Sequence, residues 1–436
     1  MPHCDMHDRE PLTSSKIVPV LLICLNVVGI LLGYATSILL ARNLSHEGFE
    51  QYIGAIATLG LLASLGEAGF GKYALKVVPV FVANKKSAML SGYLRFALLG
   101  TLLLSLLLGG FAVLVETLFR TAIASRVILL AFVFLPSMSL VGVTVDLLLS
   151  FRLATTATLI ARIFVPATTL GLIGWMTRVT EITPFDAVLC FSISSLVGMI
   201  LALLACFLRA KPVARSERPA FQYANWISNS LSFMALAFLT SWLFRSTLVL
   251  CHYIPHAGGE LAMLAPAFET GCLILLLSKS TDKYFQPDVA VVLDSNDWKH
   301  GLEMRRNRFQ LLGVGVLIFL GVIALYGKRI LNLYGDDFVY AYPSLCLVSV
   351  GSSVWTMFSL APTFLLFANQ RRPLITLLVI HAVMMTVLTV WLFSIQGALG
   401  AATAYAITTS SLALWNLTIA NRYLKKRVRD HLTATM

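Results

Sequence analysis

The sequence predicts an all-α polytopic membrane protein with about 12 transmembrane helices in two six-helix lobes and both termini in the cytoplasm. Composition, apolar runs and the distribution of basic residues support this prediction. Of the 436 residues, 58% are apolar and 12% are charged, and the mean hydropathy is +0.82. Soluble domains have roughly half apolar and about a quarter charged residues. Lipid is therefore the expected solvent for much of the chain, which excludes a soluble multidomain enzyme.

Twelve stretches are long and apolar enough to cross a membrane as helices, which requires about 20 residues. They are residues 17–42, 51–81, 88–115, 126–150, 154–176, 185–208, 226–251, 260–281, 309–327, 339–367, 373–394 and 398–421. The first stretch is longer than the apolar core of a signal peptide, about 7–15 residues, so we expect it to be an uncleaved helix.

Basic residues favour alternate connections between these stretches. With the N-terminus inside, and with Arg126 and Lys279 at span ends counted in the adjacent connections, 22 Lys and Arg residues fall in the inside connections and tails, 5 in the outside connections and 6 within spans. This bias predicts that both termini are cytoplasmic. The net charge of +12 is then mostly a consequence of topology, and no nucleic-acid partner is expected.

The chain also divides near its middle. A polar, basic linker at 209–225 separates an N-lobe of six spans, 17–208, from a C-lobe of six spans, 226–421. A cytoplasmic tail, 1–16, precedes the first lobe, and a basic cytoplasmic tail, 422–436, follows the second. Transporters are often built from two such repeats, which rock about a site near the midplane of the membrane.

Several stretches resemble the polysaccharide flippases of the multidrug/oligosaccharidyl-lipid/polysaccharide exporter superfamily. The first, 38–76, is similar to a family pattern of a helix ending in Ala-Arg, a glycine-containing turn, a tyrosine, and a small-residue helix that closes on a glycine-rich bend. Its matching residues are Ala41, Arg42, Leu44, Gly48, Phe49, Tyr52, Gly66, Gly69, Gly71 and Lys72. The second glycine of the family turn is absent, because Glu50 and Gln51 follow Phe49. The segments 284–290, 330–345 and 396–409 resemble later motifs of the family in the same order.

This resemblance implies a MATE-like fold and a specific activity. From this resemblance we expect the protein to move a lipid-linked oligosaccharide across the bacterial inner membrane. Such a substrate is an O-antigen or exopolysaccharide repeat unit on polyprenyl pyrophosphate. Its expected partners are this substrate, the membrane lipids, and a polysaccharide polymerase or other glycan-assembly proteins.

Nine charged residues of the predicted spans are candidates for a functional site, because each would cost roughly 2.5–3.5 kcal/mol at the bilayer centre. They are Arg42, Lys72, Lys76, Arg95, Arg162 and Arg245, and the acids Glu67, Asp146 and Glu269. Arg42, Lys76 and Arg95 lie within two turns of a helix end and can also reach the interface. At 1.5 Å per residue, Arg162 lies about 12 Å and Arg245 about 28 Å along its helix, so these two favour a wet cavity.

The excess of cations over anions in the spans favours an anionic cargo, because pyrophosphate is bound by charge-assisted hydrogen bonds from Arg and Lys. We therefore expect Arg162, Arg245, Lys72 and Arg42 to bind the headgroup or sugar. Glu269 and Glu67 are candidates for coupling to an H+ or Na+ gradient. Plain ion pairs are the alternative reading of the three acids: Glu67 with Lys72, Glu269 with any facing Arg, and Asp146 with Arg152.

Two apparent motifs carry no expected function. Gly66, Gly71 and Lys72 reproduce GxxxxGK, but Tyr73 occupies the position of the hydroxyl residue that a nucleotide-binding loop needs, and the segment is apolar. His3, Cys4 and His7 lie in the polar tail, and no metal site or cofactor is expected.

Three other functions are alternatives to the translocation of a lipid-linked oligosaccharide. An ion-coupled small-molecule antiporter would use the same architecture. A non-transporting scaffold of a glycan-assembly complex would use the basic tail, Arg422 to Arg429, as a docking or anionic-lipid patch. A membrane enzyme such as a polymerase or ligase needs a large external loop, and no predicted external loop exceeds about 12 residues. The chain is therefore not expected to be an enzyme.

Overall fold

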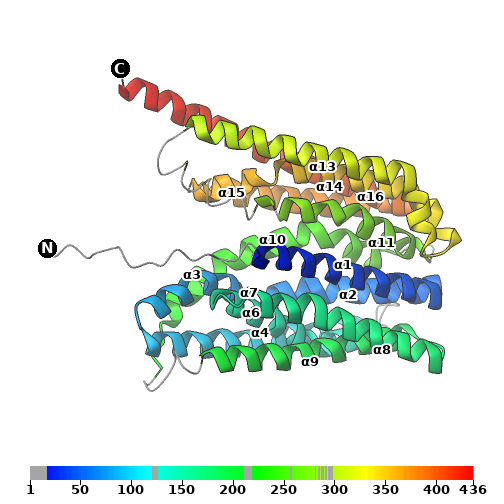
Figure 1. Cartoon of the computed structure of the whole chain (residues 1–436). Coiled ribbons are helices and arrows are strands. Elements are labelled where there is room, and N and C mark those ends of the chain that lie inside the picture. The colour runs from blue at the N-terminus through cyan, green and yellow to red at the C-terminus, as the bar shows by residue number, and fades with distance from the viewer. Residues whose placement is uncertain are drawn as a thin grey trace.

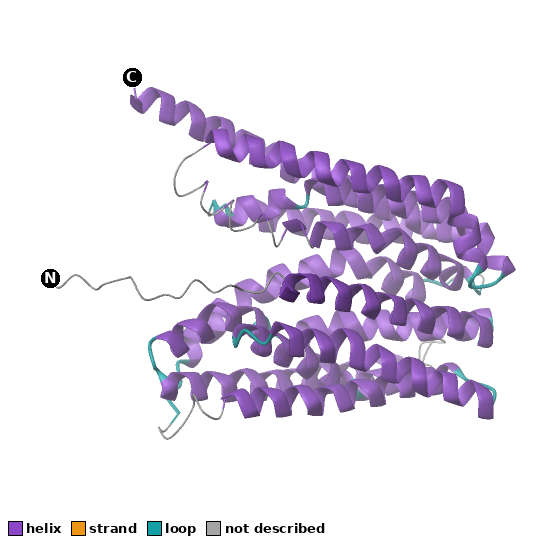
Figure 2. Ribbon diagram, viewed as in Figure 1, coloured by secondary structure: helices purple, strands orange, loops and turns teal. Residues whose placement is uncertain are grey.

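The structure is a computed structural model of the chain, and in the residues that it describes it consists of helices joined by short loops, with no strand (Figure 2). These are residues 17–119, 126–210, 219–255, 258–279, 298–368 and 370–435, together with Thr281, Asp282, Phe285, Val289 and Val292. The tail with His3, Cys4 and His7, most of the 284–290 motif and residues 211–218 of the polar linker lie outside the described residues.

The first half of the chain forms ten helical segments. They are α1 (Ile17–Asn43), α2 (His46–Gly66), α3 (Phe70–Ala83), α4 (Ser87–Phe119), α5 (Arg126–Val133), α6 (Leu135–Ser150), α7 (Ala154–Thr158), the π-helix η1 (Leu159–Phe164), α8 (Val165–Val179) and α9 (Pro184–Ala210).

The second half forms a matching set. It consists of α10 (Tyr223–Tyr253), α11 (Glu260–Gly271), the 3-10 helix η2 (Cys272–Ile274), α13 (Trp298–Asn332), the 3-10 helix η3 (Asp336–Ala341), α14 (Tyr342–Phe358), α15 (Leu360–Phe367) and α16 (Arg371–Thr435).

Among the described residues, nine helices are long and apolar enough to cross a membrane, and two bent pairs bring the number of candidate spans to 11. The longest candidate, Arg372–Lys425, contains a backbone break at Gly397. When it is divided there, each of the twelve predicted stretches coincides with one helix or one bent pair. The chain is a multi-pass membrane protein, as its composition predicts.

The bend between α2 and α3 has a local cause. The two helices meet at 42°, and Gly69 between them has φ 69°. A Cβ atom at Gly69 would lie 2.5 Å from the backbone of Ser230 and Met234 in α10. Glycine is required here because it adopts a left-handed conformation without strain and leaves room for the close approach of α10.

The helices run along a common direction, and α1 begins at the same end of the bundle at which α16 ends (Figure 1). We call this the inner end, since it is predicted to be cytoplasmic, and the opposite end the outer end. The helices α2, α6 and α9 pack together in the first half, and α14 packs on α11, α13 and α16 in the second. The first half meets the second mainly where α2 packs against α10 and α11.

Candidate functional site

Five charged side chains from four spans lie together inside the first half and at its contact with α10. We call them the central cluster; they are Glu67, Lys72, Asp146, Arg162 and Arg245. Glu67 follows the last residue of α2, Lys72 lies on α3, Asp146 on α6, Arg162 on η1 and Arg245 on α10. Four of the six predicted site residues are therefore neighbours in the structure.

Lys72 and Asp146 form an ion pair with a distance of 2.9 Å between Nζ and Oδ1. The Asp146 side chain is 6% exposed and that of Lys72 is 47% exposed. A Cβ atom at Gly71 would lie 2.6 Å from Asp146 Oδ2, so the glycine lets this carboxylate approach α3. The pairs that were the alternative reading, Asp146 with Arg152 and Glu67 with Lys72, do not form among the described residues, because packing of α3 on α6 brings Lys72 to Asp146 instead.

Arg162 lies in the π-helical segment η1 and its side chain is exposed. Helix α1 passes close to the backbone here, since a Cβ atom at Gly29 would lie 2.2 Å from the Arg162 carbonyl oxygen. Single π-helical turns widen a helix and are frequent at functional sites. Sequence periodicity does not reveal such a turn, although Pro166 shortly after it is a local signal.

Arg245 is exposed to solvent even though it lies well within α10. Its guanidinium occupies the space above Gly60 of α2, where a Cβ atom would lie 2.2 Å from Nη1. Arg162 repels it and Glu67 attracts it electrostatically. Neither Arg162 nor Arg245 forms an ion pair or a side-chain hydrogen bond with any residue that the structure describes.

Glu67 connects the two parts of the central cluster. It interacts electrostatically with Asp146, Lys72 and Arg245. Its carboxylate also sits against a glycine, since a Cβ atom at Gly142 would lie 2.0 Å from Oε1. With all five groups ionised, three cations and two anions give the cluster a charge of +1. Lys72 is neutralised locally, so the positive character of the cluster rests on the two arginines.

Arg42 and Glu269 lie apart from the central cluster, at contacts between the two halves. Arg42 Nε donates to the Leu333 carbonyl oxygen at 2.7 Å. Glu269 Oε2 accepts a hydrogen bond from the Tyr334 hydroxyl at 3.3 Å. The predicted site residues thus divide into a central group and an outer group.

Further contacts join the halves around this outer group. The Tyr34 and Thr270 hydroxyls lie 2.7 Å apart, and the rings of Tyr34 and Tyr334 meet edge to face at 5.4 Å. The Gly259 amide donates to Glu50 at 2.9 Å. These contacts close the outer end between α1 and α2 on one side and α11 and η3 on the other.

Three glycines that contact the central cluster were not singled out by the sequence. Gly29, Gly60 and Gly142 each leave space that a charged residue or its backbone fills. Glycine is common in transmembrane helices for close packing in general, so the sequence alone does not show which glycine faces a charge.

A metal centre is not part of this arrangement. Among the described residues, no group of three or more His, Cys, Asp or Glu side chains could hold a metal ion.

Comparisons with known proteins support the fold. No family model matches the chain, and no curated protein has a matching sequence. The structure is similar to that of a multidrug resistance MATE family transporter of the MOP superfamily in an inward-facing conformation, with a TM-score of 0.74 and 11% identity over 94% of this chain and 99% of that one.

Two further solved structures are similar over most of both chains. One is the lipid II flippase MurJ in an inward closed conformation, with a TM-score of 0.67 and 15% identity over 95% of this chain and 91% of that one. The other is an outward-facing MATE family transporter of the MOP superfamily, with a TM-score of 0.65 and 12% identity over 94% of this chain and 95% of that one. The chain therefore has the fold of MOP superfamily transporters.

Proposed function

We propose that this protein is a flippase that translocates a polyprenyl-pyrophosphate-linked oligosaccharide across the bacterial cytoplasmic membrane. The observation that carries the proposal is the pair Arg162 and Arg245, which repel each other and form no ion pair with any described residue, although Glu67 attracts Arg245 at longer range. Two exposed guanidinium groups held inside a membrane protein need an anion to offset their charge. A pyrophosphate headgroup supplies that anion and accepts several charge-assisted hydrogen bonds.

The contacts at the outer end suggest how translocation proceeds. Arg162 belongs to the first half and Arg245 to the second, so a headgroup bound to both arginines would join the halves. The headgroup would enter from the inner end while Arg42, Tyr34 and Tyr334 keep the outer end closed. The halves would then rock to expose the headgroup to the outer leaflet while the lipid tail stays in the bilayer.

Glu269 is our candidate for coupling this movement to an ion gradient. It is hydrogen-bonded to Tyr334 within the second half and interacts electrostatically with Tyr34 of α1 in the first half. Binding or release of H+ or Na+ there would change the strength of the outer contact. Glu67 could act similarly within the central cluster, where it balances Arg245.

An ion-coupled small-molecule antiporter is the second candidate, and a specific observation favours it. Two carboxylates, Glu67 and Asp146, lie in the central cluster, and a carboxylate is what a cationic drug would bind. The MATE family structures are described as multidrug resistance transporters, whereas MurJ is described as a lipid II flippase. The fold is common to both activities, so the cargo has to be tested directly.

The test is transport by the purified protein in liposomes. We expect a fluorescent polyprenyl pyrophosphate disaccharide added to one leaflet to reach the other faster than in empty liposomes. The variant with Arg162→Gln and Arg245→Gln should lose this activity, whereas Arg178→Gln, which removes an exposed cation of α8, should retain it. Accumulation of a cationic dye without movement of the lipid would favour the antiporter and overturn the proposal.

A further inference from the structure

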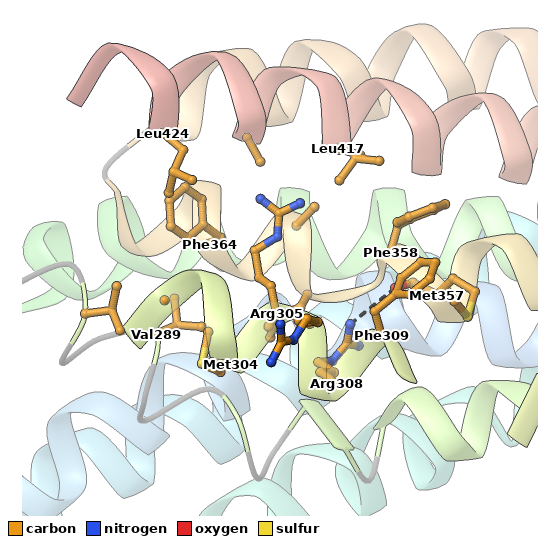
Figure 3. Close-up of a pocket in the computed structure, with 16 residues that line it drawn as sticks. Val289, Met304, Arg305, Arg308, Phe309, Met357, Phe358, Phe364, Leu417 and Leu424 are labelled. Carbon is orange, nitrogen blue, oxygen red and sulfur yellow. Dashed lines mark hydrogen bonds between the residues drawn. The ribbon is translucent and has the colours of Figure 1, made fainter. Parts of the chain in front are cut away.

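A cavity of about 370 Å³ lies within the second half, between α13, α14, α15 and α16 (Figure 3). Its size is within the range of roughly 300–1,000 Å³ that is typical of sites for small molecules. Most of its wall is apolar and includes Met304, Phe309, Phe358, Phe364, Leu417 and Leu424. An apolar chain would fit this wall better than a sugar or another polar ligand.

Three arginines of α13 also line the cavity, and one of them is used internally. Arg308 is 4% exposed. It pairs with Asp282, donates to Ser359 Oγ at 2.7 Å and donates to the Met357 carbonyl oxygen at 3.3 Å. Its charge is therefore compensated by the protein, and it holds α13 to the turn between α14 and α15.

The other two arginines are not compensated in this way. Arg305 extends from α13 toward α16 (Figure 3) and donates to Asn421 Oδ1 at 2.8 Å, whereas Arg306 is exposed. Neither pairs with a carboxylate in the part of the chain that the structure describes. Two guanidinium groups beside an apolar cavity are complementary to a molecule with an anionic head and an apolar chain.

The position of the cavity points to the membrane as the source of that molecule. It lies near the inner end of α13, which begins at Trp298, and this end is predicted to be cytoplasmic. The cytoplasmic leaflet is rich in anionic lipids, and basic pockets between helices on that side bind lipid headgroups. No residue of the central cluster lines the cavity, so it is separate from the path proposed for the cargo.

We propose that this cavity binds one anionic phospholipid, with the phosphate on Arg305 and Arg306 and an acyl chain against the apolar wall. The lipid would fill the space between α13, α15 and α16 at the inner end and so stabilise the packing of the second half. This proposal uses none of the residues on which the proposed cargo depends, so each can fail without the other.

The test is native mass spectrometry of the full chain in mild detergent, with phosphatidylglycerol and phosphatidylcholine of identical acyl chains. We expect one phosphatidylglycerol to bind about tenfold more tightly than phosphatidylcholine, as two charge-assisted contacts would give. The variant with Arg305→Gln and Arg306→Gln should lose this preference. The control with Lys76→Gln and Arg95→Gln, which removes two exposed cations from α3 and α4, should keep it.

Several results would overturn the proposal. Equal binding of the two phospholipids by the unaltered protein would do so even if the arginine variant failed to fold. An equal loss of preference in the control variant would show a general charge effect.

Competing ligands supply further outcomes that would overturn the proposal. Displacement by inorganic phosphate would identify a free anion as the ligand, and tighter binding of polyprenyl phosphate would identify the cargo lipid. Ala420→Phe, which fills the cavity, should weaken phosphatidylglycerol binding, and unchanged binding would contradict the placement of the acyl chain.

Discussion

At the scale of residues, the charges inside this membrane protein are handled in two ways. Lys72 and Asp146 neutralise each other across α3 and α6, which is the usual arrangement for charges in a bilayer. Arg162 and Arg245 instead remain exposed and within electrostatic range of each other. The first arrangement stabilises the fold, and the second is the feature that we connect to the cargo.

Gly60→Ala tests whether the position of the Arg245 guanidinium matters. The new Cβ atom would lie 2.2 Å from Nη1, so the guanidinium must move, while alanine gains up to about 1 kcal/mol of helix propensity over glycine. We expect lipid-linked substrate transport to fall about tenfold with no loss of thermal stability. Gly171→Ala serves as the control because nothing lies within 4 Å of its Cβ position, and an equal loss of transport there would refute this explanation.

Asp146→Asn tests the ion pair with Lys72. Because Lys72 is about half exposed, we expect a modest loss, about 1–2 kcal/mol in the free energy of unfolding. Replacing both residues, Lys72→Met with Asp146→Leu, should restore most of the lost stability. A denaturation series on the single and double variants measures the coupling, and strictly additive losses would exclude a stabilising pair.

The sequence identified the charged residues of the central cluster but not their partners. Apolar runs and helix spacing show that Lys72, Asp146 and Arg245 lie in spans. They do not show which faces of distant helices meet. The partner of Asp146 is on α3, 74 residues away along the chain. Only the packing of α3 against α6 brings these two residues together.

At the scale of elements, the break in α16 is built from a glycine and a matching cap. Gly397 has φ 57° and divides α16. The segment after it begins with free amide groups, and the Ala398 amide donates to Glu260 Oε2 at 2.8 Å. A carboxylate at a helix N-terminus stabilises the helix by hydrogen bonding and by its charge. The break therefore ties α16 to the start of α11.

Gly397→Ala should destabilise the protein. Alanine at φ 57° is strained by about 1–3 kcal/mol, and its Cβ atom would lie 2.5 Å from Glu260 Oε2. We expect a loss of at least about 2 kcal/mol in thermal or chemical unfolding. Gly321→Ala, with nothing within 4 Å of the new Cβ atom, should leave the stability unchanged or raise it. Equal stability of the two variants would contradict a requirement for glycine at the break.

At the scale of the whole molecule, the two halves meet through α10 and are closed at the outer end. The twelve apolar stretches predicted this architecture well, because lipid imposes a length and a polarity on every span. The glycine-rich bend that contains Gly69 and the boundary between the last two stretches, at 395–397, were also expected, and the structure has breaks at Gly69 and Gly397. The π-helical turn at Arg162 was not predicted, because local packing determines it. The closed outer end was also beyond prediction, since a sequence pattern does not distinguish one conformational state of a chain from another.

A cross-link at the outer end tests whether opening there is part of the transport cycle. A Cβ atom at Gly259 would lie 3.6 Å from His46 Cβ, which is within the range of a disulfide. We expect oxidised His46→Cys with Gly259→Cys to lose transport and a reductant to restore it. Either cysteine alone is the control. Full transport in the oxidised double variant would show that the halves do not separate at this point.

The most direct measurement of the central claim is the affinity of the purified protein for polyprenyl pyrophosphate, with and without Arg162 and Arg245. If these arginines hold the headgroup, replacing both by glutamine should weaken binding about tenfold to a hundredfold, and polyprenyl monophosphate should bind less tightly than pyrophosphate. The same replacement at Arg178 should change nothing. Unaltered affinity in the double variant would contradict the claim that an anionic headgroup occupies the central cluster.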